Sequence, residues 1–243
     1  MKNRVLVPAV FFGTAAPLVY ALLVRLLLAW FAEARSGLLL AALVYVPPAA
    51  ALLLLGLGFS LSSSMMLGVE GWDRVARLLL RSYLAVAVLC VLGLVVAAPS
   101  LGATRLSVYS FIVSTGFVSI AYAVAAAVWF LLVLPAVPLT AAYRSGPRRL
   151  SRVLRVHGAG IAARWLLSLL VAGWAAALLR LVLLSAAAPL GSRLLGFSTL
   201  SWTVLRLEEA LLPRLADLVV APFWLSLVSV VYSRLVGILL YDL

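Results

Sequence analysis

The sequence predicts an all-α polytopic membrane protein: a bundle of about six transmembrane helices, with short amphipathic helices at the membrane interface. Of its 243 residues, 66% are hydrophobic and 11% are charged, and the mean hydropathy is +1.23. A soluble domain of this length is about half apolar and about a quarter charged. The apolar residues gather in runs of the length that crosses a bilayer, about 20 residues. A single transmembrane domain therefore accounts for residues 1–243.

The predicted spans cover about residues 5–31, 37–59, 79–98, 108–139, 161–189 and 215–240. Prolines interrupt the second run at Pro47 and Pro48 and the fourth at Pro135 and Pro138. Membrane helices tolerate proline where neighbouring groups satisfy the freed backbone. The fourth run is longer than one span requires, so we expect its end to kink or to project.

The net charge of +12 would indicate nucleic-acid binding in a soluble protein. Here the arginines lie mainly in loops between apolar runs, so we expect membrane lipids as partners and no nucleic acid. The N-terminus and the loops before the third and fifth runs carry most of the basic residues. The positive-inside rule then places both termini in the cytoplasm of a multi-pass protein of the cell membrane.

Two basic segments share the pattern G-x-x-R-apolar-x-R-apolar-apolar, one over residues 71–79 and one over residues 146–154. Arginines three residues apart share one helical face, so each segment predicts a short helix lying flat at the headgroups. The arginines that we expect to contact anionic lipid or a protein partner are Arg74, Arg77, Arg148, Arg149, Arg152 and Arg155. The alternative is that these arginines only determine the orientation of the helices in the membrane. The pattern also predicts an internal repeat of 71–145 and 146–243, as some transporters have.

A further amphipathic stretch, residues 198–211, predicts a short helix on the opposite membrane surface. Arg180 lies inside the fifth apolar run, where a charge calls for a partner. Glu208, Glu209 and Asp217 are its candidates for an intramembrane ion pair, and snorkelling or substrate contact are the alternatives. Arg25 lies nearer a span end, where an arginine can snorkel.

The residues that catalysis and metal binding require are scarce. The chain has one cysteine, Cys90, one histidine, His157, and seven acidic residues, without a recognisable motif. The serines at 62–64 share a predicted side with His157, but no spacing joins them. We therefore expect no enzyme, no metal site and no cofactor.

Short stretches resemble the glycerophosphoryl diester phosphodiesterase membrane-domain-like families, which include the bacterial YciC-type membrane proteins. The stretches are Leu134-Pro135-Ala136-Val137, then Gly146-Pro147-Arg148-Arg149-Leu150, and Leu239-Leu240-Tyr241-Asp242-Leu243. Members often have a proline in span four, a basic amphipathic segment, and a closing run with two tyrosines before an aspartate. This chain has one tyrosine there. The resemblance implies six spans and an accessory membrane domain without its own active site.

Three functions follow as hypotheses. The first is a non-enzymatic scaffold or accessory subunit that contacts anionic lipid or a partner through its basic segments. The second is a transporter or permease subunit with a substrate path at the midplane. The third is an enzyme that acts on lipids, but the sequence offers little that could form the cluster of acidic or histidine residues that such an enzyme needs. Frequent glycine and alanine would allow a homo-oligomer, and the absence of glutamine, with Asn3 as the only asparagine, is typical of a thermophile.

Overall fold

The structure is a computed structural model that describes residues 5–34, 37–69, 71–97, 108–142, 150–194 and 201–241. Side chains are described for residues 5–33, 38–69, 71–97, 116–142, 155, 158–185 and 216–237. The predicted Arg148 and Arg149 lie outside the described residues. Arg152, Glu208 and Glu209 lie in described helices, but their side chains are outside the described set.

The described residues form helices and no strand, and six helices are long and apolar enough to cross a membrane. The predicted six-span helical class is therefore confirmed. The elements are α1 (Val7–Ala34), α2 (Gly37–Met66), α3 (Trp72–Ala97), α4 (Val108–Val128), η3 (Trp129–Val133), α5 (Leu134–Ala142), α6 (Leu150–Leu194) and α7 (Ser201–Tyr241).

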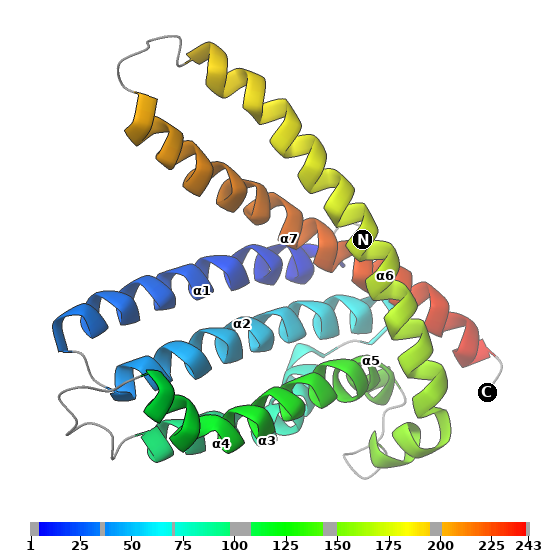
Figure 1. Cartoon of the computed structure of the whole chain (residues 1–243). Helices are drawn as coiled ribbons and strands as arrows, with labels where there is room; N and C mark the ends of the chain where they lie inside the picture. The colour runs from blue at the N-terminus through cyan, green and yellow to red at the C-terminus, as the bar shows by residue number, and fades with distance from the viewer. Residues whose placement is uncertain are drawn as a thin grey trace.

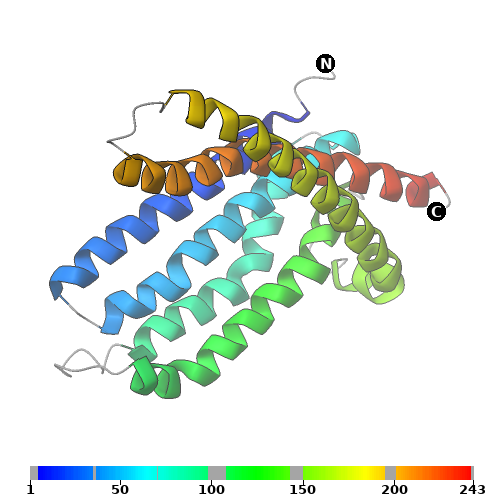
Figure 2. The ribbon, with the colours of Figure 1, turned by 45° about the horizontal axis from the view of Figure 1, so that its top comes forward.

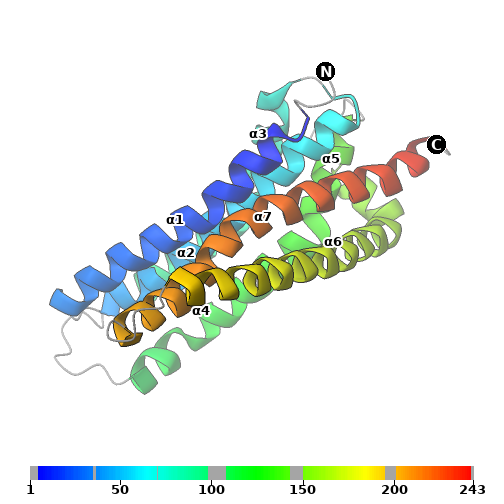
Figure 3. The same ribbon diagram turned by 90° about the horizontal axis from the view of Figure 1, so that it is seen from above.

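The helices run up and down, and α1 begins at the same end of the bundle at which α7 ends (Figures 1 and 3). Consecutive helices α1, α2, α3 and α4 pack side by side in a row (Figure 2). The α6–α7 hairpin crosses this row: α7 contacts α1 and α2, and α6 contacts η3 and α5. Toward its own start, at the end of the bundle far from both chain termini, α7 diverges from α1 (Figure 1).

Helix α2 continues past the predicted end at residue 59 to Met66. The added turns contain Ser60, Ser62, Ser63 and Ser64, all of which are buried. The hydropathy of the sequence predicted that these serines belong to a polar segment between two spans. They stay helical because the protein interior, and not lipid or water, surrounds them.

The fourth span combines α4, η3 and α5 in one helix with a π-helical turn over Trp129–Val133. The backbone N–H of Leu134 donates to the carbonyl of Trp129, five residues earlier. Such a turn is a local widening of an α-helix. The distortion that we predicted for this long run therefore lies at Trp129–Val133. The end of the run does not project, because residues Leu134–Ala141 are buried.

The short separate helices expected at the membrane surfaces are instead turns of longer helices. The first basic segment begins α3, which runs unbroken from Trp72 to Ala97. Helix α6 begins at Leu150 and passes Pro189, and α7 begins at Ser201 and passes Pro213. Each proline removes only one helical hydrogen bond, and leucine and alanine, strong helix formers, surround them. The expected loop over 190–213 is therefore mostly helix.

Glycines bring the helices into close contact at four points. A Cβ atom on Gly56, Gly58 or Gly93 would come within 2.7 Å of the side chains of Trp129, Leu225 or Tyr45. A Cβ on Gly13 would meet the backbone of Pro222 at 2.6 Å. These glycines allow close contacts between helices of one chain. From the number of glycines, the sequence had suggested contacts between subunits.

Tyrosine hydroxyls join the helices of the row. Tyr83 of α3 donates to the Ala49 carbonyl at 2.7 Å, and Tyr122 of α4 donates to the Tyr45 carbonyl at 3.3 Å. The Tyr45 hydroxyl lies 2.6 Å from the Ser119 hydroxyl. Both accepting carbonyls lie close to the Pro47–Pro48 pair. These hydrogen bonds therefore connect α2 to α3 and α4 near its two prolines.

Candidate functional site

The turn between α2 and α3 sets the direction of the first basic segment. The N–H of Val69 donates to the Ser64 carbonyl at 2.9 Å, and the N–H of Gly68 donates to the Met65 carbonyl at 3.1 Å. Gly68 has φ +77°, so these bonds form a Schellman cap. Gly71, at φ +122°, then redirects the chain into α3. Neither position suits a residue with a side chain.

One face of α3 changes from basic to apolar along its length. Arg77 and Arg81 are exposed on this face, and Leu84, Val88 and Val95 follow them, exposed by 62%, 48% and 59%. Arg77 Nε donates to the carbonyl of Asp73 at 3.1 Å. A lipid-facing helix changes in this way at the headgroup level, so Arg81 and Leu84 bracket one membrane boundary.

The second basic segment is represented by two arginines of α6. Arg155 is exposed, and Arg164 is partly buried and donates to the Gly160 carbonyl at 3.2 Å. We call the end of the bundle that carries Arg74, Arg77, Arg81, Arg155, Arg164 and Arg234 the basic end. Asp73 is the acidic residue described at this end, and none of the six arginines forms an ion pair with a described acidic side chain.

Buried polar and aromatic side chains close the interior at the basic end. The Ser62 hydroxyl accepts the backbone N–H of Ala9 at 2.9 Å and so caps the first turn of α1. Trp165 packs against Phe59 and edge-to-face against Tyr232, at ring-centroid distances of 4.5 and 5.6 Å. The Tyr232 hydroxyl donates a short hydrogen bond to the Pro135 carbonyl. This cluster joins α1, α2, α5, α6 and α7.

Sequence reasoning missed this buried cluster, although it noted three of its serines. The available signal was four serines within residues 60–64 of a chain that is otherwise apolar. The expected separation of these serines from His157 is not tested, because the His157 side chain is not described. The hydroxyls of Ser60, Ser63 and Ser64 have no hydrogen-bond partner among the described residues.

Arg180 lies opposite Asp217, one of its three predicted partners. Arg180 Nε is 3.0 Å from Asp217 Oδ1, and each side chain is 46% exposed. Arg180 is 16 residues after Arg164 on α6, or about 24 Å along the helix. The pair therefore lies in the half of the bundle away from the basic end, and it connects α6 to α7.

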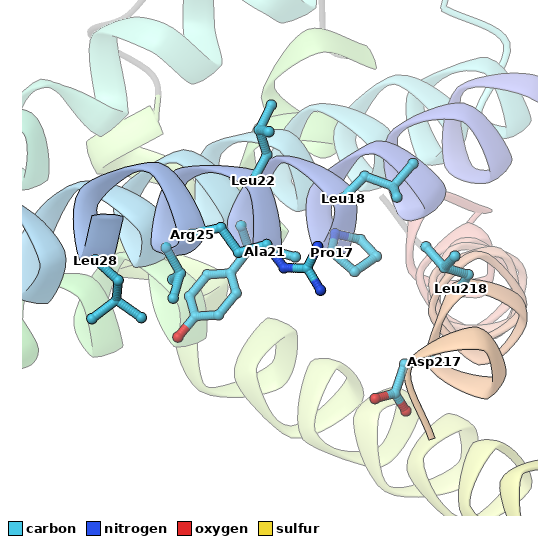
Figure 4. A pocket seen from close by; sticks show the side chains of 10 residues that line it. Pro17, Leu18, Ala21, Leu22, Arg25, Leu28, Asp217 and Leu218 are labelled. Carbon is cyan, nitrogen blue, oxygen red and sulfur yellow. The ribbon is translucent and has the colours of Figure 1, made fainter. Parts of the chain in front are cut away.

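A groove opens sideways between α1 and α7, on the outside of the bundle (Figure 4). Its volume is about 620 Å³. We call it the lateral groove, and its lining consists of Pro17, Leu18, Tyr20, Ala21, Leu22, Val24, Arg25, Leu28, Asp217 and Leu218. Arg25 and Asp217 are the charged residues in an otherwise mostly apolar wall. The groove occupies the region where α7 splays from α1.

Comparison of the chain with protein-family models, with curated proteins and with solved structures finds no match. The family resemblance noted above therefore rests on its short stretches of sequence alone. Among the described residues, no three histidine, cysteine or acidic side chains lie together as metal ligands would. The features that remain for a functional argument are the basic end and the lateral groove.

Proposed function

We propose that the protein is a non-enzymatic integral membrane protein, a scaffold or accessory subunit, whose basic end faces the cytoplasm and holds anionic lipid headgroups. The observation that carries this proposal is the unbalanced charge of the basic end. Six described arginines are distributed over α3, α6 and α7 there, with Asp73 as the acid described beside them. Anionic lipids of the inner leaflet supply the complementary charge.

The geometry of α3 favours lipid over a soluble partner as the first contact. Arg77 and Arg81 lie on the same helical face as Leu84 and Val88. The arginines can therefore contact the headgroup of a lipid while Leu84 and Val88 contact its acyl chains. Trp72, exposed by 52% at the start of α3, has the amphipathic ring that the interface favours. A soluble protein would contact the arginines without the apolar continuation.

The permease hypothesis receives less support. It needs a polar or hydrated path at the midplane. Where α2 meets its neighbours, Gly56 contacts Trp129 and Gly58 contacts Leu225 without space for a further methyl group. The groove that does open lies on the outside of the bundle.

The proposal is tested by lipid selectivity in reconstituted membranes. Spin-labelled phosphatidylglycerol and phosphatidylcholine are compared for the fraction immobilised by the full chain in phosphatidylcholine bilayers. Replacing Arg77 and Arg81 by glutamine should lower the preference for phosphatidylglycerol, by roughly fivefold per arginine at low salt. The paired lysine variants are the matched control and should keep the preference, because they keep the charge.

High salt should weaken the wild-type preference more than that of the glutamine variant, which keeps the other four arginines of the basic end. Selectivity that is insensitive both to the substitutions and to salt would refute the proposal. The cytoplasmic orientation is tested separately, by a fluorescent protein and an alkaline phosphatase fused after Leu243. Fluorescence without phosphatase activity is the expected outcome.

A further inference from the structure

The lateral groove holds a cation that the described residues leave without a counter-charge. Of the two charged residues in its wall, Asp217 is engaged by Arg180, at 3.0 Å. Arg25 is exposed and forms no ion pair or hydrogen bond with a described residue. The groove therefore has a net positive charge at Arg25, inside a helix that is long and apolar enough to span the membrane.

The direction of the Arg25 side chain makes this charge deeper than its position suggests. Helical side chains lean toward the N-terminus of their helix, and Figure 4 shows Arg25 extending along α1 toward Pro17. The nearer membrane surface lies the other way, toward Glu33, which is eight residues or about 12 Å along the helix. Snorkelling to that surface, as the sequence suggested, does not match this direction. A guanidinium at such depth calls for a polar or charged partner, and an anion also neutralises its charge.

The rest of the wall suits a hydrocarbon chain. Leu18, Leu22 and Leu28 are exposed by 50%, 58% and 46% along α1, and Leu218 of α7 lies near Leu18 at one end of the groove (Figure 4). The volume of about 620 Å³ falls within the range of small-molecule sites, about 300–1,000 Å³. The lining residues belong to two helices that are long and apolar enough to span a membrane, Val7–Glu33 and Ala216–Gly237, and lipid is the molecule that surrounds such helices.

We propose that the lateral groove binds one anionic phospholipid, with its phosphate on the Arg25 guanidinium and an acyl chain along the leucines. Arginine binds phosphate oxygens with two parallel hydrogen bonds, which gives the site both charge and orientation. A second copy of this chain fits less well. Its described acids are Glu33 and Asp73 at span ends and Asp217, which Arg180 already holds, so none of them is an unpaired anion at the depth of Arg25.

This lipid differs in position from the lipid at the basic end, because Arg25 and Asp217 lie in the other half of the bundle. The inference therefore goes beyond the proposed function and does not depend on it. Native mass spectrometry of the full chain in mild detergent gives the test. The protein is titrated with dioleoyl phosphatidylglycerol and, separately, with dioleoyl phosphatidylcholine.

We expect one phosphatidylglycerol to bind saturably and more tightly than phosphatidylcholine. Arg25→Gln should weaken phosphatidylglycerol binding at least tenfold, because a charge-assisted contact is lost. It should weaken phosphatidylcholine binding less, because the choline group already neutralises that phosphate. Arg25→Lys is the matched control, because it keeps a positive charge in the groove, and it should retain the preference for phosphatidylglycerol. Ala21→Phe fills the groove without changing charge and should also abolish the tight site.

Equal binding of the two lipids, or tight phosphatidylglycerol binding that survives Arg25→Gln or Ala21→Phe, would overturn the proposal. A stable dimer that Ala21→Phe dissociates would assign the groove to a second copy and would also overturn it. If Arg25→Gln does not fold, Ala21→Phe decides alone. The Arg77 and Arg81 glutamine variant should retain the tight lipid, so failure of this inference is distinguishable from failure of the proposed function.

Discussion

The contact between Gly13 of α1 and Pro222 of α7 offers a direct test of how these helices pack. A Cβ atom on residue 13 would lie 2.6 Å from Pro222 Cα and 3.1 Å from Pro222 N. Carbon atoms in ordinary contact are about 3.5–4.0 Å apart. In Gly13→Ala the two helices must therefore separate by about 1 Å at this point, because the backbone of Pro222 cannot rotate away.

Overpacking of this kind costs about 1–3 kcal/mol, and the upper half of the range applies because backbone is met. Alanine returns up to about 1 kcal/mol through its helix propensity. We expect Gly13→Ala to lower the free energy of unfolding by about 1–2 kcal/mol, a factor of roughly 5–30 in the unfolding constant. Titration of detergent-solubilised protein with sodium dodecyl sulfate, followed by tryptophan fluorescence, measures this change.

Gly173→Ala is the matched control in α6, since a Cβ there meets nothing within 4 Å. It should be neutral or stabilising by up to about 1 kcal/mol. If Gly13→Ala is as stable as the wild type while Gly173→Ala behaves as expected, the close approach of α1 to α7 is wrong. The wall of the lateral groove would then need revision as well.

Two further variants probe the buried cluster at the basic end, by the same unfolding titration. Tyr232→Phe removes the hydroxyl that donates to the Pro135 carbonyl, and we expect a loss of about 0.5–1.5 kcal/mol; no loss would mean that the bond contributes nothing. Ser62→Ala leaves the Ala9 N–H without its acceptor, which should cost about 1–3 kcal/mol. Ser60→Ala is its control, because that hydroxyl has no described partner, and equal losses in both serine variants would contradict the assigned cap.

The sequence determined the number and type of the membrane spans because both depend on local properties. Hydropathy over about 20 residues reports whether a segment prefers lipid, and the arginines of the loops gave one end its positive charge. The same local reasoning placed helix ends wrongly where tertiary contacts override it. Ser60–Ser64 continue α2 because other helices bury them.

The tertiary structure alone decided which charges meet. Three acids were candidates for Arg180, and Asp217 contacts it because α6 and α7 are antiparallel neighbours with these residues at one level. That pairing also explains why Arg25, which looked like a snorkelling residue near a span end, is left without a counter-charge. Its surroundings come from α7, nearly 200 residues further along the chain. Hydropathy averages along one helix, so it cannot report a groove whose two walls come from opposite ends of the sequence.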